Sequence, residues 1–232
     1  MFAVGFQRAR SEEQRAQRRE AILATAAAML DETSVSALTL SELSRRVGLA
    51  KSNVLRYFES REDVLLELLD RWSGEWVVEL AAAAGTVDPG ADVMARIGAF
   101  AEVVAHTASA RPALLALISA QSEVLEHNVS TQAVLRHKHA TLAVLDRLVG
   151  VLRGAVPEVG DAAGELCLTI AVLAGAFAAQ ANTSVSCETA FAADPALQVL
   201  RIDLAPMLRG ATAALIAGAL VQDASGGSAA SR

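Results

Sequence analysis

The sequence contains few aromatic residues, cysteines and prolines, and the shortage of cysteine excludes one class of protein. Aromatic side chains make up 4% of the 232 residues, and the chain has two cysteines and five prolines. A small secreted domain held by disulfides would carry more cysteines in a shorter chain. Cys167 and Cys187 have no metal-ligand or redox spacing. We therefore expect two free, buried thiols in a reducing cytoplasm.

Long apolar runs are also missing. The longest, over residues 166–179, has 14 residues and includes a threonine, whereas a membrane-spanning helix needs roughly 20. The N-terminal apolar stretch is short and precedes the basic residues, which is the reverse of the order in a secretion signal. We therefore expect a cytoplasmic protein that does not contact a membrane.

Apolar residues at helical spacing are abundant. Hydrophobic residues make up 53% of the chain, much of it alanine, and β-branched runs are short. This composition and periodicity predict an all-α protein. Breaks in the pattern predict four regions: a mobile basic arm (1–15), a small helical domain (16–78), a larger helical domain (79–222) and a disordered tail (223–232). The last helix is expected to open at Asp194-Pro195 and to bend at Pro206.

The charge is distributed unevenly along the chain. The net charge is −6, yet residues 1–61 carry a net charge of +3 and residues 62–232 a net charge of −9. A basic N-terminal part on an acidic body is the asymmetry expected when only the N-terminal part meets phosphate.

Residues 39–58 carry the pattern of a helix-turn-helix. Thr39-Leu-Ser-Glu42 is a capping box, in which Thr39 caps the first amides and Glu42 reaches back. Gly48 can end this short helix in a left-handed turn. A second helix is expected over residues 50–57, and Ser60 caps the next one.

The second helix of such a unit enters the major groove of DNA and presents its N-terminal side chains to base edges. The predicted base contacts are Lys51, Ser52 and Asn53, because lysine can donate to guanine and asparagine can pair with adenine. The predicted phosphate contacts are Thr39, at a helix N-terminus, and Arg56, Tyr57 and Arg61.

Residues 16–70, about a quarter of the chain, resemble the DNA-binding domain of the tetracycline repressor (TetR) family. The resemblance rests on the Thr39 cap, the hydrophobic-Gly-hydrophobic turn around Gly48, the pair Tyr57-Phe58 and the basic Arg61. It implies a transcriptional regulator that binds double-stranded DNA. The rest of the chain matches no motif of the family, and its helical pattern is compatible with the family's second domain.

Three positions depart from the family pattern. Ala50 stands where a serine or threonine cap is frequent, and losing a cap typically costs about 1 kcal/mol. Leu55 stands where many members carry a phosphate-contacting tyrosine, so Arg56 or Tyr57 is expected to take that contact. Arg61 replaces a frequent lysine, and arginine can hold a phosphate with two hydrogen bonds.

The resemblance also implies a C-terminal domain that binds a small molecule and forms a homodimer through its last two long helices. Small side chains at helical spacing mark the expected dimer contacts: Ala171, Ala174, Gly175 and Ala178. A central core helix in a monomer is the alternative. Apolar side chains with a few polar neighbours mark the expected pocket: Phe100, Val104, Leu117, Gln121, Leu142, Phe177 and Asn182. Ordinary core packing is the alternative for each of them.

The functional hypothesis is therefore a ligand-responsive repressor that a small molecule of unknown identity releases from a pseudo-palindromic operator. An activator would use the same DNA-binding residues. An enzyme is not expected, because the chain carries no catalytic or phosphate-loop motif. A helical adaptor that no longer binds DNA is the remaining alternative. No cofactor or metal is expected. The side chains of His137 and His139, two positions apart, point in different directions on a helix, and we expect all four histidines to be solvated.

Overall fold

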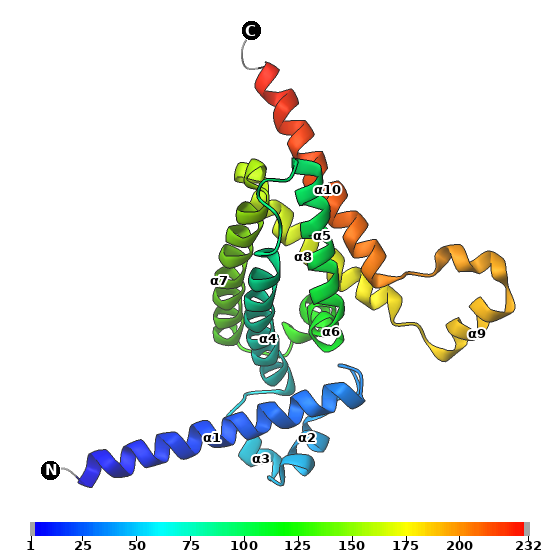
Figure 1. The fold of residues 1–232 in the computed structure, drawn as a ribbon. Coiled ribbons are helices and arrows are strands. Elements are labelled where there is room, and N and C mark those ends of the chain that lie inside the picture. Colours follow the sequence, from blue (N-terminus) through cyan, green and yellow to red (C-terminus); the bar gives the residue numbers. More distant parts are fainter. Residues whose placement is uncertain (1–2, 230–232) are drawn as a thin grey trace. The chain divides into compact units, whose positions relative to one another are not determined.

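A computed structural model describes residues 3–229, and side chains are described over residues 12–222. All regular elements among these residues are helical, which confirms the all-α prediction. Their bounds in chain order are α1 (Ala3–Glu32), α2 (Leu40–Val47), α3 (Lys51–Val54), α4 (Arg61–Ala84), α5 (Val93–Ser109), α6 (Pro112–Ala120), η1 (Gln121–Leu125), α7 (Thr131–Ala155), η2 (Pro157–Ala162), α8 (Ala163–Ala181), α9 (Val185–Ala193), η3 (Pro195–Leu200) and α10 (Leu204–Ala229) (Figure 1).

The chain divides into two compact units. The first comprises residues up to Leu69 and the segment Ala120–His137, and the second comprises Asp70–Ser119 and the chain from Lys138 onward. The boundary expected after residue 78 falls inside α4, whereas the units divide between Leu69 and Asp70.

The two terminal segments are helical where they are described. Residues 3–15, expected as an arm, belong to α1, and residues 223–229, expected as a tail, belong to α10. The remaining residues of the expected arm and tail, 1–2 and 230–232, lie outside the described residues. The mobility of both segments stays a prediction.

The first unit has buried apolar side chains on α1, α2, α3 and α4 and also in the segment Ala120–His137, where Leu125 is fully buried. Helix α1 buries side chains spaced three or four residues apart, which form one face. Helices α2, α3 and α4 add their apolar positions to this core. The core side chains that are at most 2% exposed include Ile22, Leu23, Ala26, Met29, Leu43, Val54, Phe58, Val64 and Leu65.

The second unit is built around α5, α8 and α10. Helix α10 packs against both α5 and α8 (Figure 1). Ile97, Phe100 and Val104 of α5 join Leu208 and Ile216 of α10 in one buried cluster.

Polar contacts also stabilise the second unit. The Trp76 indole N–H donates to Thr107 Oγ1 at 3.1 Å. The Arg96 guanidinium, 11% exposed, binds the carboxylate of Glu158 and, at 3.2 Å, the carbonyl oxygen of Ala155. Arg96 thereby holds α5 to the end of α7 and to η2.

The segment between α8 and α10 differs from the sequence prediction. The last helix begins at Leu204 and not at Asp194, because Pro195 opens only the short 3₁₀ helix η3. Pro206 lies in the first turn of α10, where the missing N–H breaks no hydrogen bond, so no bend is required there.

We call residues 182–203 the α9 arm. It projects from the α5, α8 and α10 layer in Figure 1.

The contacts that shape the α9 arm are mostly its own. Glu188 binds Arg201 at 2.8 Å and accepts a hydrogen bond from Thr183. The Gln198 side-chain amide donates to the carbonyl oxygen of Phe191 at 2.7 Å, and the Arg201 guanidinium lies 5.7 Å from the centre of the Phe191 ring. Val185 and Val199 remain 85% exposed.

Two helical stretches are long and apolar enough to cross a membrane by length and composition, although the longest uninterrupted apolar run has only 14 residues. They are Pro157–Ala181 and Leu204–Gln222, and a third would arise if α5 and the α6–η1 stretch formed one bent span. An uninterrupted apolar run is too strict a criterion, since a span tolerates an occasional polar residue. Only 33% and 17% of the residues in their most apolar windows are buried. Each helix therefore keeps apolar surface that the second unit leaves uncovered.

The thiols and histidines differ in part from expectation. Cys167 is buried, and burial raises the pKa of its thiol to about 11, whereas Cys187 is only half-buried. His137 is buried in the first unit, with Nε2 3.8 Å from Glu126 Oε1, so it is not the solvated histidine expected from the sequence. No group of three or more His, Cys, Asp or Glu residues among those described could hold a metal ion.

Candidate nucleic-acid interface

Helix α2 and the turn after it have the predicted caps. Thr39 Oγ1 accepts a hydrogen bond from the Glu42 N–H at 3.2 Å. Gly48 ends the helix with φ of 74° and ψ of 29°, a left-handed conformation that an L side chain would strain. Its N–H donates to the Arg45 carbonyl oxygen at 3.2 Å, and the Leu49 N–H donates to that of Ser44 at 3.0 Å.

The second half of the expected capping box does not form. The Glu42 carboxylate binds the guanidinium groups of Arg45 and Arg46, at 2.6 and 3.0 Å, because both lie on its own helix face. These hydrogen bonds hold the pKa of Glu42 at about 2. Arg46 also binds Glu32 of α1 at 2.7 Å, so the network links α2 to α1.

Helix α3 is shorter and less regular than the sequence predicts. Only residues 51–54 are α-helical, and the chain continues to Tyr57 as a turn. Ala50 makes no side-chain cap. Lys51, Ser52 and Asn53, the predicted base contacts, are all exposed at its N-terminal end.

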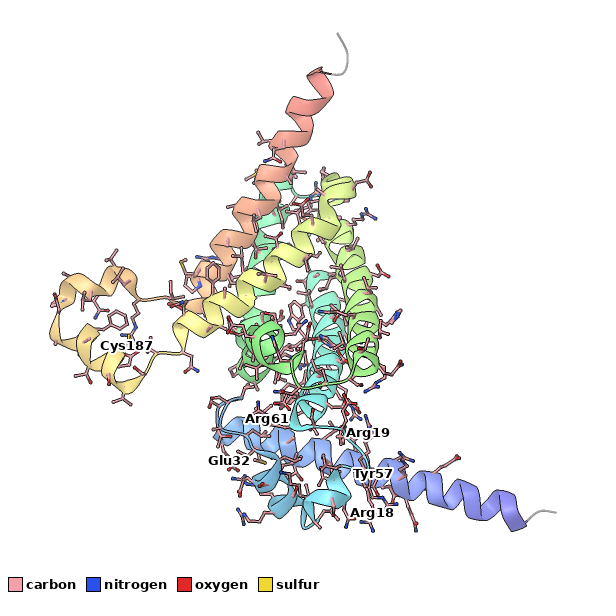
Figure 2. The ribbon with its side chains drawn as sticks, turned by 180° about the vertical axis from the view of Figure 1, so that it is seen from behind. Arg18, Arg19, Glu32, Tyr57, Arg61 and Cys187 are labelled. Carbon is pink, nitrogen blue, oxygen red and sulfur yellow. The ribbon has the colours of Figure 1, made fainter. Side chains whose placement is uncertain are left out.

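Two kinds of contact fix the position of α3. Apolar side chains are buried beneath it, and one arginine of α1 binds the turn that follows it. Val54 and Phe58 are at most 1% exposed, and the Arg19 guanidinium lies 4.1 Å from the centre of the Phe58 ring. The same guanidinium donates to the Tyr57 carbonyl oxygen and pairs with Glu67. Figure 2 labels Arg19 of α1 close to Tyr57. Arg19 thus ties α1 to the end of the turn and to α4.

Arg61, one of the four predicted phosphate contacts, is engaged within the protein. Its guanidinium donates to the carbonyl oxygens of Leu38, at 2.9 Å, and Ser36, at 3.4 Å, and pairs with Glu62 at 2.9 Å. Arg61 therefore stabilises the loop before α2. Thr39 and Arg56 are exposed and Tyr57 is half-buried.

Two adjoining hollows lie beside the predicted contacts. The first, about 270 Å³, is lined by Gln14, Arg15, Arg18, Arg56 and Tyr57. The second, about 300 Å³, is lined by Leu49 and Asn53 together with Arg18, Arg56 and Tyr57. The α1 residues were not among the predicted contacts, although the spacing of Arg15 and Arg18 places them on one helix face. Figure 2 shows Arg18 near Tyr57.

The expected pocket residues of the C-terminal part do not share one environment. Phe100, Val104 and Leu117 are buried, whereas Leu142 is 57% exposed and Asn182 is also exposed. Phe177 is half-buried against the core of the second unit. Gln121 belongs to the first unit, where its amide donates to Glu126 Oε1 at 2.8 Å.

The expected dimer contacts are partly covered by the chain itself. Ala174 and Gly175 are buried, and a Cβ added to Gly175 would lie 2.9 Å from Ile118 Cγ2 of α6. Gly175 therefore allows close packing of α8 on α6 within one chain. Ala171 and Ala178 are half-buried.

Sequence comparison matches nearly the whole chain to two family models. Residues 22–68 match the model described as bacterial regulatory proteins of the tetR family. Residues 70–223 match the model described as the tetracyclin repressor-like C-terminal domain. A search of curated proteins finds no significant match.

Solved structures share the fold at low sequence identity. A TetR transcriptional regulator from Rhodococcus sp. RHA1 is 15% identical with a TM-score of 0.52, and the match covers 89% of this chain and 96% of that one. The fatty acid degradation regulator FadR from Bacillus halodurans is 15% identical with a TM-score of 0.51, over 86% and 94% of the two chains. At these identities the likeness concerns the fold alone.

Proposed function

The chain belongs to the TetR family of DNA-binding transcriptional regulators, and we propose that it represses transcription as a homodimer on a pseudo-palindromic operator until a small molecule releases it. Regulators of this family are in general not enzymes. A cytoplasmic location is part of the proposal, because the protein must be in the same compartment as its operator DNA.

The exposed polar end of α3 carries this proposal. Lys51, Ser52 and Asn53 present donors and acceptors that match base edges in a major groove. The helix that bears them is held by the buried Val54 and Phe58, so its position does not depend on DNA. A preformed reading surface reduces the ordering cost of binding.

Uncovered apolar surface on α8 and α10 supports the homodimer. Leu168 and Val172 of α8 are 54% and 62% exposed, and Met207 of α10 is 41% exposed. Adjacent exposed apolar side chains on long helices mark an interaction surface. In a member of this family we assign that surface to a second copy of the chain and not to a membrane. These residues replace the buried Ala174 and Gly175 as the proposed contacts.

The release step requires a particular thermodynamic relation. A small molecule can move the dimer off DNA only if it binds the DNA-incompetent conformation more tightly than the competent one. An activator would differ only in which conformation the ligand favours. The proposed effector site lies in the C-terminal part, where Phe177 and Leu117 remain candidates.

Asn53→Ala tests the base contact that the proposal requires. A preferred duplex is first selected from random sequences with the full-length protein. Asn53→Ala is then expected to weaken binding to that duplex by about 1–3 kcal/mol and to relax the preference at one base pair. Gel-shift titrations over all single substitutions of the duplex measure both effects.

Asn128→Ala is the matched control, because Asn128 is also an exposed asparagine of the first unit. It should bind the selected duplex like the wild type. If selection yields no duplex that binds more tightly than random DNA at moderate salt, the adaptor alternative replaces the regulator.

A further inference from the structure

Arg15 and Arg18 of α1 line a hollow beside the predicted DNA contacts, and neither was among those contacts. We propose that Arg15 and Arg18, together with Arg56 and Tyr57, hold one phosphate group of the DNA backbone beside the base-reading end of α3. This assignment rests on the proposed DNA binding and adds to it a contact that orients α1 on the duplex.

The geometry brings together side chains from distant parts of the sequence. Arg15 and Arg18 lie on α1, and Arg56 and Tyr57 lie in the turn after α3, yet all four line the same hollow of about 270 Å³. Gln14 adds an amide donor to its wall. The hollow therefore presents several N–H and O–H donors to one small volume, which suits an oxyanion.

The charges of the hollow are not neutralised. None of Arg15, Arg18 and Arg56 forms an ion pair with a described residue. Arg19, Arg45, Arg46 and Arg61 of the same unit all pair with glutamates. Three unpaired guanidinium groups around one hollow repel one another, and an anion between them removes that repulsion.

The position of the hollow favours the DNA backbone over a free anion. The adjoining hollow is lined by Arg18, Arg56 and Tyr57 and also by Asn53, the predicted base contact. In a DNA strand whose base contacts Asn53, a backbone phosphate would therefore lie close to Arg18 and Arg56. Leu55, which precedes Arg56 in the chain, is apolar and 43% exposed, so its side chain offers no donor to a phosphate, whereas the arginines of the hollow do.

The test measures duplex binding by the full-length protein as a function of salt. Arg18→Ala is expected to weaken binding to selected and random duplexes alike, by about tenfold, and to lower the slope of log affinity against log salt by about one unit. Arg18→Lys should keep the slope, because the charge remains. Fluorescence anisotropy between 50 and 300 mM KCl gives both quantities.

Arg147→Ala is the charge-matched control. Arg147 is an exposed arginine of α7 in the second unit and changes the net charge by the same amount. Its affinity and salt slope should remain those of the wild type. If Arg18→Ala matches Arg147→Ala while the wild type binds its selected duplex, the phosphate site is wrong and the regulator stands. If the wild type itself binds no duplex, the proposed function fails first.

A separate measurement distinguishes backbone phosphate from free phosphate. Pyrophosphate is titrated into the wild type and Arg18→Ala at constant ionic strength, and the melting temperature is followed. If Arg18→Ala abolishes stabilisation by pyrophosphate but leaves duplex affinity unchanged, the hollow holds free phosphate groups and the backbone assignment is overturned. A loss of duplex affinity with the lower salt slope supports the backbone assignment.

Discussion

Phe58→Ala is expected to lower the free energy of unfolding of the first unit by about 3–5 kcal/mol, the usual cost of emptying a buried phenylalanine site. The ring is 1% exposed and lies beneath the Arg19 guanidinium. Its loss opens a cavity under α3 and removes the aromatic face from Arg19. Since Arg19 also holds the Tyr57 carbonyl oxygen and Glu67, the turn that follows α3 and ends at Tyr57 loses its support.

Urea unfolding followed by circular dichroism measures this loss, and duplex binding is measured where the variant is still folded. Phe58→Leu is the control, because it keeps most of the apolar volume and should cost less than about 1.5 kcal/mol. An equal, small loss for both variants would mean that the ring does not support α3. We also expect Phe58→Ala to reduce the affinity for the selected duplex more than the affinity for random DNA, because base contacts need a helix in a fixed position.

Gly175→Leu is expected to destabilise the second unit by about 3 kcal/mol, at the upper end of overpacking effects. The first added carbon would already lie 2.9 Å from Ile118 Cγ2 and 3.3 Å from the Ser119 backbone nitrogen. Helix α8 would have to move away from α6, which would loosen the core around Ala174 and Cys167.

Gly150→Ala is the control for glycine replacement in a helix. A Cβ at Gly150 of α7 would meet nothing within 4 Å, so alanine should stabilise the helix by about 0.5–1 kcal/mol. Thermal unfolding and light scattering are measured on both variants. If Gly175 instead served the dimer contact, Gly175→Leu would dissociate the dimer while leaving the protomer's unfolding unchanged, and the packing assignment would be wrong.

The sequence predicted best what depends on neighbouring residues. The all-α class, the Thr39 cap and the left-handed Gly48 follow from local backbone chemistry, and each agrees with the structure. The missing side-chain cap at Ala50 was also predicted. Sequence rules do not decide between two partners that are both close in the chain. Glu42 could bind the Thr39 backbone or the arginines one turn on, and the two charges decided it.

The sequence could not predict contacts between distant residues. Arg15 and Arg18 lie about 40 positions before Arg56, so only the folded first unit brings them to one hollow. Helical periodicity similarly cannot tell a face packed inside one chain from a face that meets another chain. Ala174 and Gly175 therefore fitted a dimer contact by pattern, although α6 of the same chain covers Gly175.

The self-contained α9 arm has a consequence for local unfolding. Its helices are short, the hydrogen bonds and the ion pair that hold them join residues within 182–203, and Val185 and Val199 bury almost none of their surface. Segments with few buried apolar contacts open at a small fraction of the global unfolding free energy. Amide hydrogens of α9 and η3 should therefore exchange with deuterium well before those of α5, which pulse labelling with mass spectrometry can measure. Slow exchange confined to the dimeric protein would instead show that a second copy covers the arm.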